Sequence, residues 1–307
     1  MKPDQAARRR GPLPTAAQLF TSLPRPLRRH RLMRAWMAMT RESPLQLVRL
    51  REGAYGYTDL SDGFQRLIVV EGGFDHHLLG MADRFLAEGG VFLDVGANHG
   101  LVSFGLAARH SGRVEFHLFE PNAHLHTAIA MSRQLYPDMR FHLAPFAVSD
   151  HDGTVSFTVV ADQTGVSHID PQGLNTVRAV KLDSYLDEAA IDDVTFMKVD
   201  IEGFELTALR GARASLEARR IKAVYFEYCE RWLARDQGAA ALLSYLEEVG
   251  YEACFCRPWD VKRAGGATQT LRSGLAGHGT PLTPVAGHAL PPETDLLAVP
   301  KEHLAPL

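Results

Sequence analysis

Carboxylates recur where apolar stretches of this 307-residue chain end. Asp94 lies within the run VFLDV and is followed by the loop GANHG, with glycines at 96 and 100. Glu120 closes VEFHLF, 24 residues beyond Gly96. Ligands of open α/β sheets bind beyond the carboxyl ends of the strands. The two acids and the loop are therefore predicted to form one binding edge.

The composition of this loop bears on which ligand it would take. Gly96 and Gly100 let a backbone approach a ligand without a Cβ clash, and the helix beginning near His99 offers unpaired N–H groups. A carboxylate at Glu120 can accept both ribose hydroxyls of an adenosine cofactor. The loop lacks the middle glycine of the dinucleotide fingerprint G-x-G-x-x-G. Asp94, just before it, would repel a pyrophosphate but suit the amine and sulfonium of S-adenosylmethionine.

A third group of acids lies within the stretch FMKVDIEGFE, where Asp200 and Glu202 precede a glycine. The next apolar stretch, AVYFEY, carries Glu227 near its end. Acids at helix starts also act as caps, which is the preferred interpretation of Glu205. Asp200 and Glu202 are predicted to be catalytic, as candidate general bases. Convergence with Glu227 on a divalent cation is conceivable chemically, but their separation in sequence argues against it and no metal is predicted.

These acids require strands and helices that bring them to one edge. Between residues 90 and 256, strands that are apolar throughout alternate with amphipathic helices. This alternation predicts an α/β fold with a mostly parallel central sheet and helices on both faces. Residues 257–294 are rich in glycine and proline and show no period, so a long loop insertion is expected there. DLLAVP at 295–300 is expected to be the last strand.

Charge is distributed unevenly along the chain. Residues 1–41 contain ten Lys or Arg against one acid, whereas the whole chain has a net charge of −3. Residues 1–45 are therefore predicted to be a basic N-terminal extension, an arm before one domain spanning 46–307. The basic charge is confined to this arm, which lacks an interleaved aromatic platform, so no nucleic-acid partner is expected.

The remaining composition points to a cytoplasmic protein. No stretch approaches the ~18 apolar residues of a membrane helix, so stable membrane insertion is not expected. The basic start is not followed by the apolar region of a secretory signal. Three cysteines without framework spacing favour a reducing compartment. The oligomeric state is left open.

Several motifs occur in a specific order: FLDVGANHGLVS, FEPN, AVSD, DGTVSF, KLDSYL and MKVDIEGFELTALRGA. In this combination the chain resembles the FkbM family of S-adenosylmethionine-dependent methyltransferases, a class I Rossmann-like group, over residues 90–256. The resemblance implies methyl transfer, most often to a hydroxyl of a small molecule, sugar or polyketide-like product. The basic arm and the 257–294 insertion are additions to the shared pattern, so the acceptor is not defined by it.

The resemblance also implies roles for individual residues. The methionine end of the cofactor would be held by Asp94, Gly96, Asn98 and Gly100. Glu120 would hold the ribose. The residues implied near the adenine are Ala147, Val148, Ser149 and Asp150. Asp200 and Glu202 would border the transferring methyl group.

Two other functions are compatible with parts of the sequence. A nicotinamide-dependent oxidoreductase would share the sheet edge and the ribose acid, but the missing glycine counts against it. A non-catalytic binding protein on the same fold would rely on the basic arm. The acceptor expected for the methyltransferase is a small molecule or a glycan.

Overall fold

The computed structural model describes residues 33, 35, 39, 43–50, 54–71, 75–110, 112–257, 260, 269–272 and 275–306. The predicted basic arm, residues 1–45, lies almost wholly outside these residues. Within them, no helix combines the length and apolar character needed to cross a membrane.

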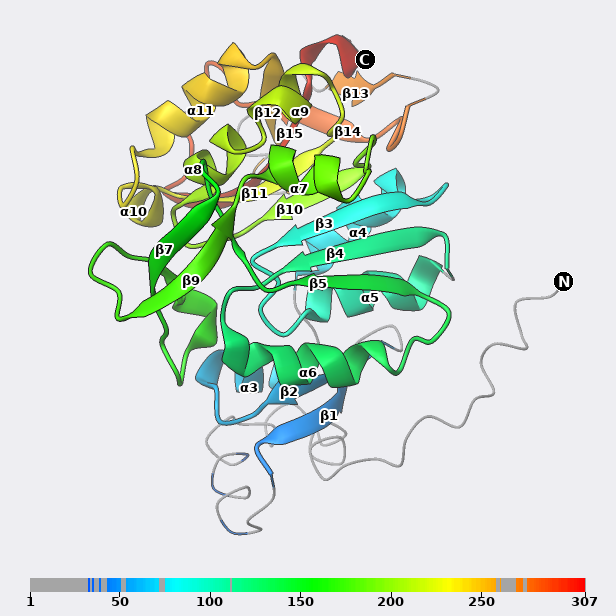
Figure 1. The fold of residues 1–307 in the computed structure, drawn as a ribbon. Coiled ribbons are helices and arrows are strands. Elements are labelled where there is room, and N and C mark those ends of the chain that lie inside the picture. The colour runs from blue at the N-terminus through cyan, green and yellow to red at the C-terminus, as the bar shows by residue number, and fades with distance from the viewer. Residues whose placement is uncertain are drawn as a thin grey trace, which may run out of the picture.

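The described part of the chain is built around a ten-stranded mixed sheet (Figure 1). The parallel half consists, from its edge inward, of β5 (Arg140–Ala144), β4 (Val114–Phe119), β3 (Gly90–Val95), β10 (Phe196–Val199) and β11 (Val224–Cys229). The second half continues, each strand antiparallel to the one before, with β15 (Glu293–Pro300), β12 (Tyr251–Phe255), β14 (Pro281–Pro284), β13 (Gln269–Leu271) and β16 (Leu304–Pro306).

Helices cover both faces of this sheet because its central strands are apolar on both sides. In β3, Phe92 enters one hydrophobic core and its neighbour Leu93 enters the other. The Phe92 core is covered by α4 (His76–Phe85), α5 (Leu101–His110) and α6 (Ala123–Arg133). The Leu93 core is covered by α7 (Leu182–Glu188), α8 (Glu205–Arg210), α9 (Arg213–Glu217) and α11 (Ala239–Glu248). A short helix, α10 (Glu230–Leu233), follows β11. The predicted α/β fold with helices on both faces is confirmed.

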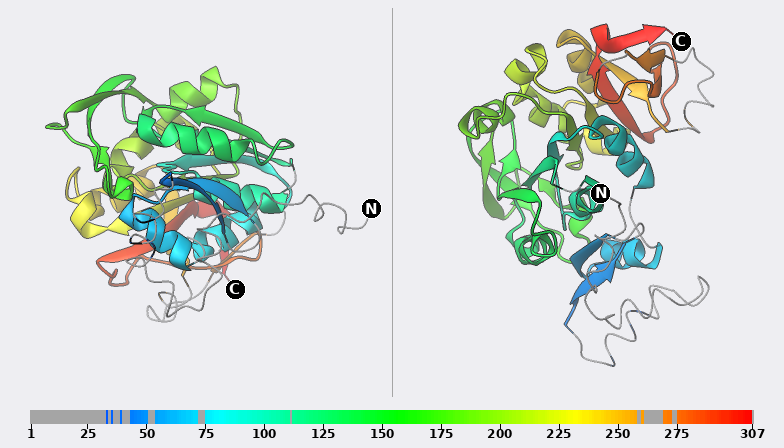
Figure 2. Two further views of the ribbon diagram at one scale, coloured as in Figure 1. Left: turned by 90° about the horizontal axis from the view of Figure 1, so that it is seen from below. Right: turned by 90° about the vertical axis from the view of Figure 1, so that its right-hand side faces the viewer.

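Two smaller units lie beside the main sheet. The hairpin of β1 (Leu45–Arg49) and β2 (Tyr55–Asp59), followed by α3 (Gly63–Glu71), packs on α6 and lies at the opposite end of the molecule from β16 (Figure 2). A four-stranded sheet contains, in spatial order, β6 (Ala147–Val148), β9 (Asn175–Val180), β7 (Gly153–Thr158) and β8 (His168–Ile169). Its connecting turn η4 (Thr164–Val166) approaches the start of α3.

The segment 257–294 differs from the expected loop. It contains β13 and β14, and β15 already begins at Glu293. Leu271 and Leu282 of these short strands are buried in the core beneath α4 and α5. Their glycine- and proline-rich surroundings hide the alternation that predicts a strand, and their pairing depends on neighbours distant in sequence.

Candidate active site

Two loops meet at the carboxyl edge of the parallel strands, one after β3 and one after β10. Gly96, in the first loop, has a φ of 79°. A Cβ added there would lie 2.0 Å from the carbonyl oxygen of Asp200 in the second loop. Glycine is therefore required at position 96 because the backbone of the loop after β10 passes close to it. This requirement holds whether or not a ligand also approaches the loop.

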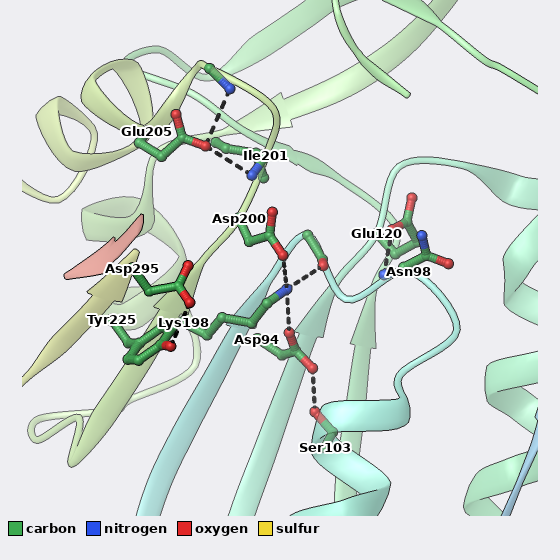
Figure 3. A network of polar contacts seen from close by, with 12 residues as sticks. Asp94, Asn98, Ser103, Glu120, Lys198, Asp200, Ile201, Glu205, Tyr225 and Asp295 are labelled. Atoms are coloured by element: carbon green, nitrogen blue, oxygen red, sulfur yellow. Dashed lines mark hydrogen bonds and ion pairs between the residues drawn. The ribbon is translucent and has the colours of Figure 1, made fainter. Parts of the chain in front are cut away.

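Asp94 lies beneath these loops and has no exposed surface. One of its oxygens, Oδ2, accepts a hydrogen bond of 2.6 Å from the Ser103 hydroxyl of α5. The other, Oδ1, lies 3.3 Å from Nζ of Lys198 (Figure 3). Asp94 lines neither of the cavities described below. In this conformation it holds the loop from below, and direct contact with a cofactor remains a prediction.

Lys198 is a buried cation at the centre of the site that the sequence interpretation missed. Its Nζ donates to the carbonyl oxygen of Gly96 at 2.7 Å and lies 3.4 Å from Oδ2 of Asp200. Burial opposes its charge, but Asp200 and Asp94 outweigh burial and raise the pKa of Lys198. A single lysine in the apolar run FMKV is the signal that could have revealed it, because a buried charge needs a partner.

Glu120, at the end of β4, organises the first loop. Its Oε2 accepts from the N–H of Asn98 and its Oε1 from the N–H of Asn122, both at 2.8 Å. Burial raises the pKa of Glu120 to about 7, although these two N–H groups act in the opposite direction. Asn98 has a φ of 51°, a left-handed backbone conformation that is unfavourable for a residue with a Cβ. The hydrogen bond from its N–H to Glu120 helps to hold the turn in this conformation.

A small cleft of about 50 Å³ lies beside Glu120. Ala147 and Val148, implied near the adenine, line it together with Glu120, implied at the ribose. Asp150 does not line either cavity; it is exposed and its Oδ1 lies 2.9 Å from Nδ1 of His151. Gly100 lines neither cavity and supports the loop, because its N–H donates to the carbonyl of Ala97.

A larger cavity of about 600 Å³ adjoins this cleft, and Asp200, Glu202 and Glu227 lie in its wall. One carboxylate oxygen from each of these residues lies within 4.8 Å of the other two. Because these residues lie far apart in the chain, their convergence was not predicted. The fold brings them together at the ends of β10 and β11.

Two of these carboxylates, Glu202 and Glu227, have raised pKa values because they are buried close to other acids. Burial, and then the charges of Asp200 and Glu205, raise the pKa of Glu202 to about 8. Burial, and then Asp200 and Glu202, raise the pKa of Glu227 to about 9. In the described structure Oε2 of Glu202 is buried and makes no hydrogen bond. Such a group can take up a proton near neutral pH, and its hard oxygens would also suit a divalent cation.

Glu205 has a structural role, but it binds the loop before α8 and does not cap the helix as predicted. Its Oε1 accepts from the N–H groups of Ile201 and Gly203 at 3.0 and 3.2 Å, in the first turn of α8. It therefore fixes the backbone on which Glu202 stands. Glu202 itself has a φ of 59°, and this turn directs its side chain into the cavity wall.

Segments outside the central motifs complete the larger cavity. Its wall also includes Phe64, Gln65, His76, His77, Gln163, Arg257 and Glu293. Gln65 Nε2 and Thr164 Oγ1 each donate to Oδ1 of Asn98 at 3.3 Å. His99 also lines the cavity, and burial lowers its pKa to about 4, so its imidazole is neutral. Apart from His99, which lies in the loop after β3, no local sequence signal identifies these residues, because only the tertiary fold brings them together.

Comparison with known proteins identifies the family. Residues 94–253, more than half of the chain, match the family model described as the methyltransferase FkbM domain. This protein belongs to the FkbM methyltransferase family. The match begins at Asp94 and includes Glu120, Asp200 and Glu227, so these four carboxylates lie within the family domain. A comparison with curated proteins found no match.

Solved structures of methyltransferases are among those similar to the chain. A precorrin-6y C5,15-methyltransferase from Geobacter metallireducens is 12% identical, with 74% of this chain and 89% of that one covered and a TM-score of 0.37. A SAM-dependent O-methyltransferase from Thermotoga maritima is 10% identical, with 86% and 80% covered and a TM-score of 0.38. TYW2 of M. jannaschii, in complex with AdoMet, is 10% identical, with 87% and 88% covered and a TM-score of 0.37.

Proposed function

We propose that this FkbM-family protein transfers a methyl group from S-adenosylmethionine to a hydroxyl of a small-molecule or glycan acceptor. One observation carries the proposal. The cleft beside Glu120 and the larger cavity share five wall residues, namely Gly96, Asn98, Gly165, Asp200 and Glu202. A cofactor in the cleft would therefore meet an acceptor in the cavity at the point where candidate bases stand.

The residues of the cleft fit this cofactor. Glu120 offers a carboxylate to a ribose, and Ala147 and Val148 offer an apolar surface to an adenine. Asp200 and Glu202, at the junction, would face the cationic sulfonium end with negative charge. When bound, S-adenosylmethionine supplies an electrophilic methyl carbon at this junction.

The chain's own contribution is orientation and proton transfer. The loops that Gly96 and Lys198 hold together would fix the acceptor in line with the methyl group, which is worth several kcal/mol in well-oriented reactions. Asp200 or Glu202 would accept the hydroxyl proton as the new O–C bond forms and the S–C bond breaks.

The alternative functions receive less support. The chain belongs to a methyltransferase family, and the loop after β3 lacks the glycine pattern of dinucleotide-binding proteins. Both observations count against a nicotinamide-dependent oxidoreductase. A purely binding role gives no reason for a buried carboxylate oxygen of Glu202 without a hydrogen bond. A cytoplasmic location and the lack of a nucleic-acid partner remain predictions from composition.

The proposal is tested with methyl-labelled S-adenosylmethionine and a panel of hydroxylated small molecules and glycans. One of the variants Asp200→Asn and Glu202→Gln, the one that replaces the base, is expected to lower kcat by about 10²–10⁴-fold. Asp150→Asn, an exposed carboxylate outside both cavities, should leave kcat unchanged. Full turnover in both active-site variants, or labelling of nitrogen instead of oxygen, would contradict the proposal.

A further inference from the structure

A second cluster of polar side chains lies away from both cavities, on the edge strands β4 and β5. His117 of β4 is paired in register with His142 of β5, and Glu115 lies two residues before His117 on the same face. Oε1 of Glu115 is 3.0 Å from Nε2 of His142 and 3.4 Å from Nε2 of His117. The three donor atoms all lie within 4.8 Å of one another.

The arrangement of His117 is unusual for an ordinary core histidine. The residue is only 2% exposed, and its Nε2 has the long 3.4 Å contact with Oε1 of Glu115 in place of a well-formed hydrogen bond. Its other nitrogen, Nδ1, lies 2.8 Å from the hydroxyl of Tyr185 in α7. A buried polar atom without a hydrogen bond requires an explanation, because most such atoms in native proteins are satisfied.

We propose that Glu115, His117 and His142 bind a transition-metal ion of the zinc class. Two imidazole nitrogens and one carboxylate oxygen form a donor set that suits Zn²⁺, with a solvent molecule in the fourth position. The contact between Tyr185 and Nδ1 would orient the His117 ring, as partners of metal-bound histidines do.

Neighbouring groups are compatible with this site. Arg140 contacts the other carboxylate oxygen of Glu115, Oε2, at 3.1 Å and leaves Oε1 toward the histidines. A hydrogen bond donated by Nδ1–H of His117 to the Tyr185 hydroxyl would leave the lone pair of Nε2 directed toward Glu115 and His142. The two histidine rings stack with centroids 4.5 Å apart. Ion binding therefore requires His142, whose side chain is 50% exposed, to turn out of the stack.

The location of the site indicates a structural role. β5 is the outermost strand of the main sheet at this end, and none of the three residues lines either cavity. An ion at this site would fasten β5 to β4, with α7 connected through Tyr185. Metal binding at this site would thus stabilise the fold without entering the reaction.

Titration calorimetry of the full chain with Zn²⁺ alone tests the proposal, together with the visible absorption of bound Co²⁺. We expect one site of micromolar or tighter affinity and a Co²⁺ spectrum typical of nitrogen ligation. His142→Ala should weaken binding at least tenfold, and Tyr185→Phe by about 10–100-fold. The matched control His124→Ala, an exposed histidine of α6, should bind as the wild type does.

The same measurements separate this site from the carboxylates of the larger cavity. His142→Ala should retain its affinity for S-adenosylmethionine. No Zn²⁺ uptake by the wild type, or equal uptake by His142→Ala, would overturn the proposal. An ion retained by His142→Ala but lost in Glu227→Gln would place binding in the cavity and overturn it as well.

Discussion

Single residues at the meeting point of two loops set the geometry of the site. Gly96 is the clearest case, because any Cβ there would collide with the Asp200 carbonyl. Lys198 acts from below and connects the Gly96 carbonyl with Asp94 and Asp200. A cofactor loop and a candidate base are thus held by one buried cation. A change at either position should affect binding and catalysis together.

Gly96→Ala should lower both the free energy of unfolding and the affinity for S-adenosylmethionine. Its positive φ alone costs about 1–2 kcal/mol for a residue with a Cβ, and the clash with Asp200 adds to this. Gly287→Ala is the matched control, because Gly287 has a φ of 80° with no atom within 4 Å of the added Cβ. Urea denaturation of both variants measures the difference. Equal destabilisation would show that the close approach of the two loops is unimportant.

At the level of elements, much of the site could be predicted and some of it could not. β3, β4 and β10 are apolar runs that end near Asp94, Glu120 and Asp200, so strand pattern and position at the sheet edge are visible locally. Gln65 and Arg257 reach the same cavity from segments with no such pattern. Their contribution depends on how α3 and the β12 end pack on the sheet, which local periodicity does not encode.

The same limit applies to the sheet itself. The parallel strands and β15 follow from apolar runs in the sequence, but β13, β14 and β16 are short strands that pair with distant partners. β13 has three residues, within a segment rich in glycine and proline. Its single buried leucine, Leu271, is too weak a pattern to predict a strand.

α3 and η4 are connected to each other and both contact Asn98, in the loop after β3. Asp62 accepts from the N–H groups of Phe64 and Gln65 at the start of α3 through Oδ1. Its Oδ2 accepts from both the N–H and the hydroxyl of Thr164 at 2.6 Å. One buried carboxylate therefore caps a helix and attaches a neighbouring turn to it.

Asp62→Ala should lower the free energy of unfolding by about 1–3 kcal/mol, because it removes a cap and leaves buried N–H groups unpaired. It should also weaken S-adenosylmethionine binding, since Thr164 and Gln65 both contact Asn98. Thr164→Val removes the hydroxyl contacts and keeps the cap, so its loss of stability should be smaller. Thermal denaturation and calorimetry check both effects, and equal losses in the two variants would contradict the helix-capping role.

For the whole molecule, the cluster of acids makes stability depend on pH. Glu202 and Glu227 have pKa values of about 8 and about 9, above their ordinary value of 4.5. Between pH 4.5 and these raised pKa values, Glu202 and Glu227 therefore keep protons in the folded protein that they have released in the unfolded chain. The free energy of unfolding should fall as pH rises from 4.5 toward 9. Melting temperatures across this range should show the decline, and Glu202→Gln should make it shallower. A flat or rising profile above pH 6 would contradict these protonation states.

The central claim is that the cleft beside Glu120 binds S-adenosylmethionine, and titration calorimetry of the purified protein tests it most directly. Wild type should bind with micromolar affinity. Glu120→Gln should bind at least about tenfold more weakly, because a charged acceptor of hydrogen bonds is worth about 1.5–3 kcal/mol. Asp150→Asn should bind as the wild type does. A folded wild type that does not bind the cofactor, or a Glu120→Gln variant with unchanged affinity, would contradict the account.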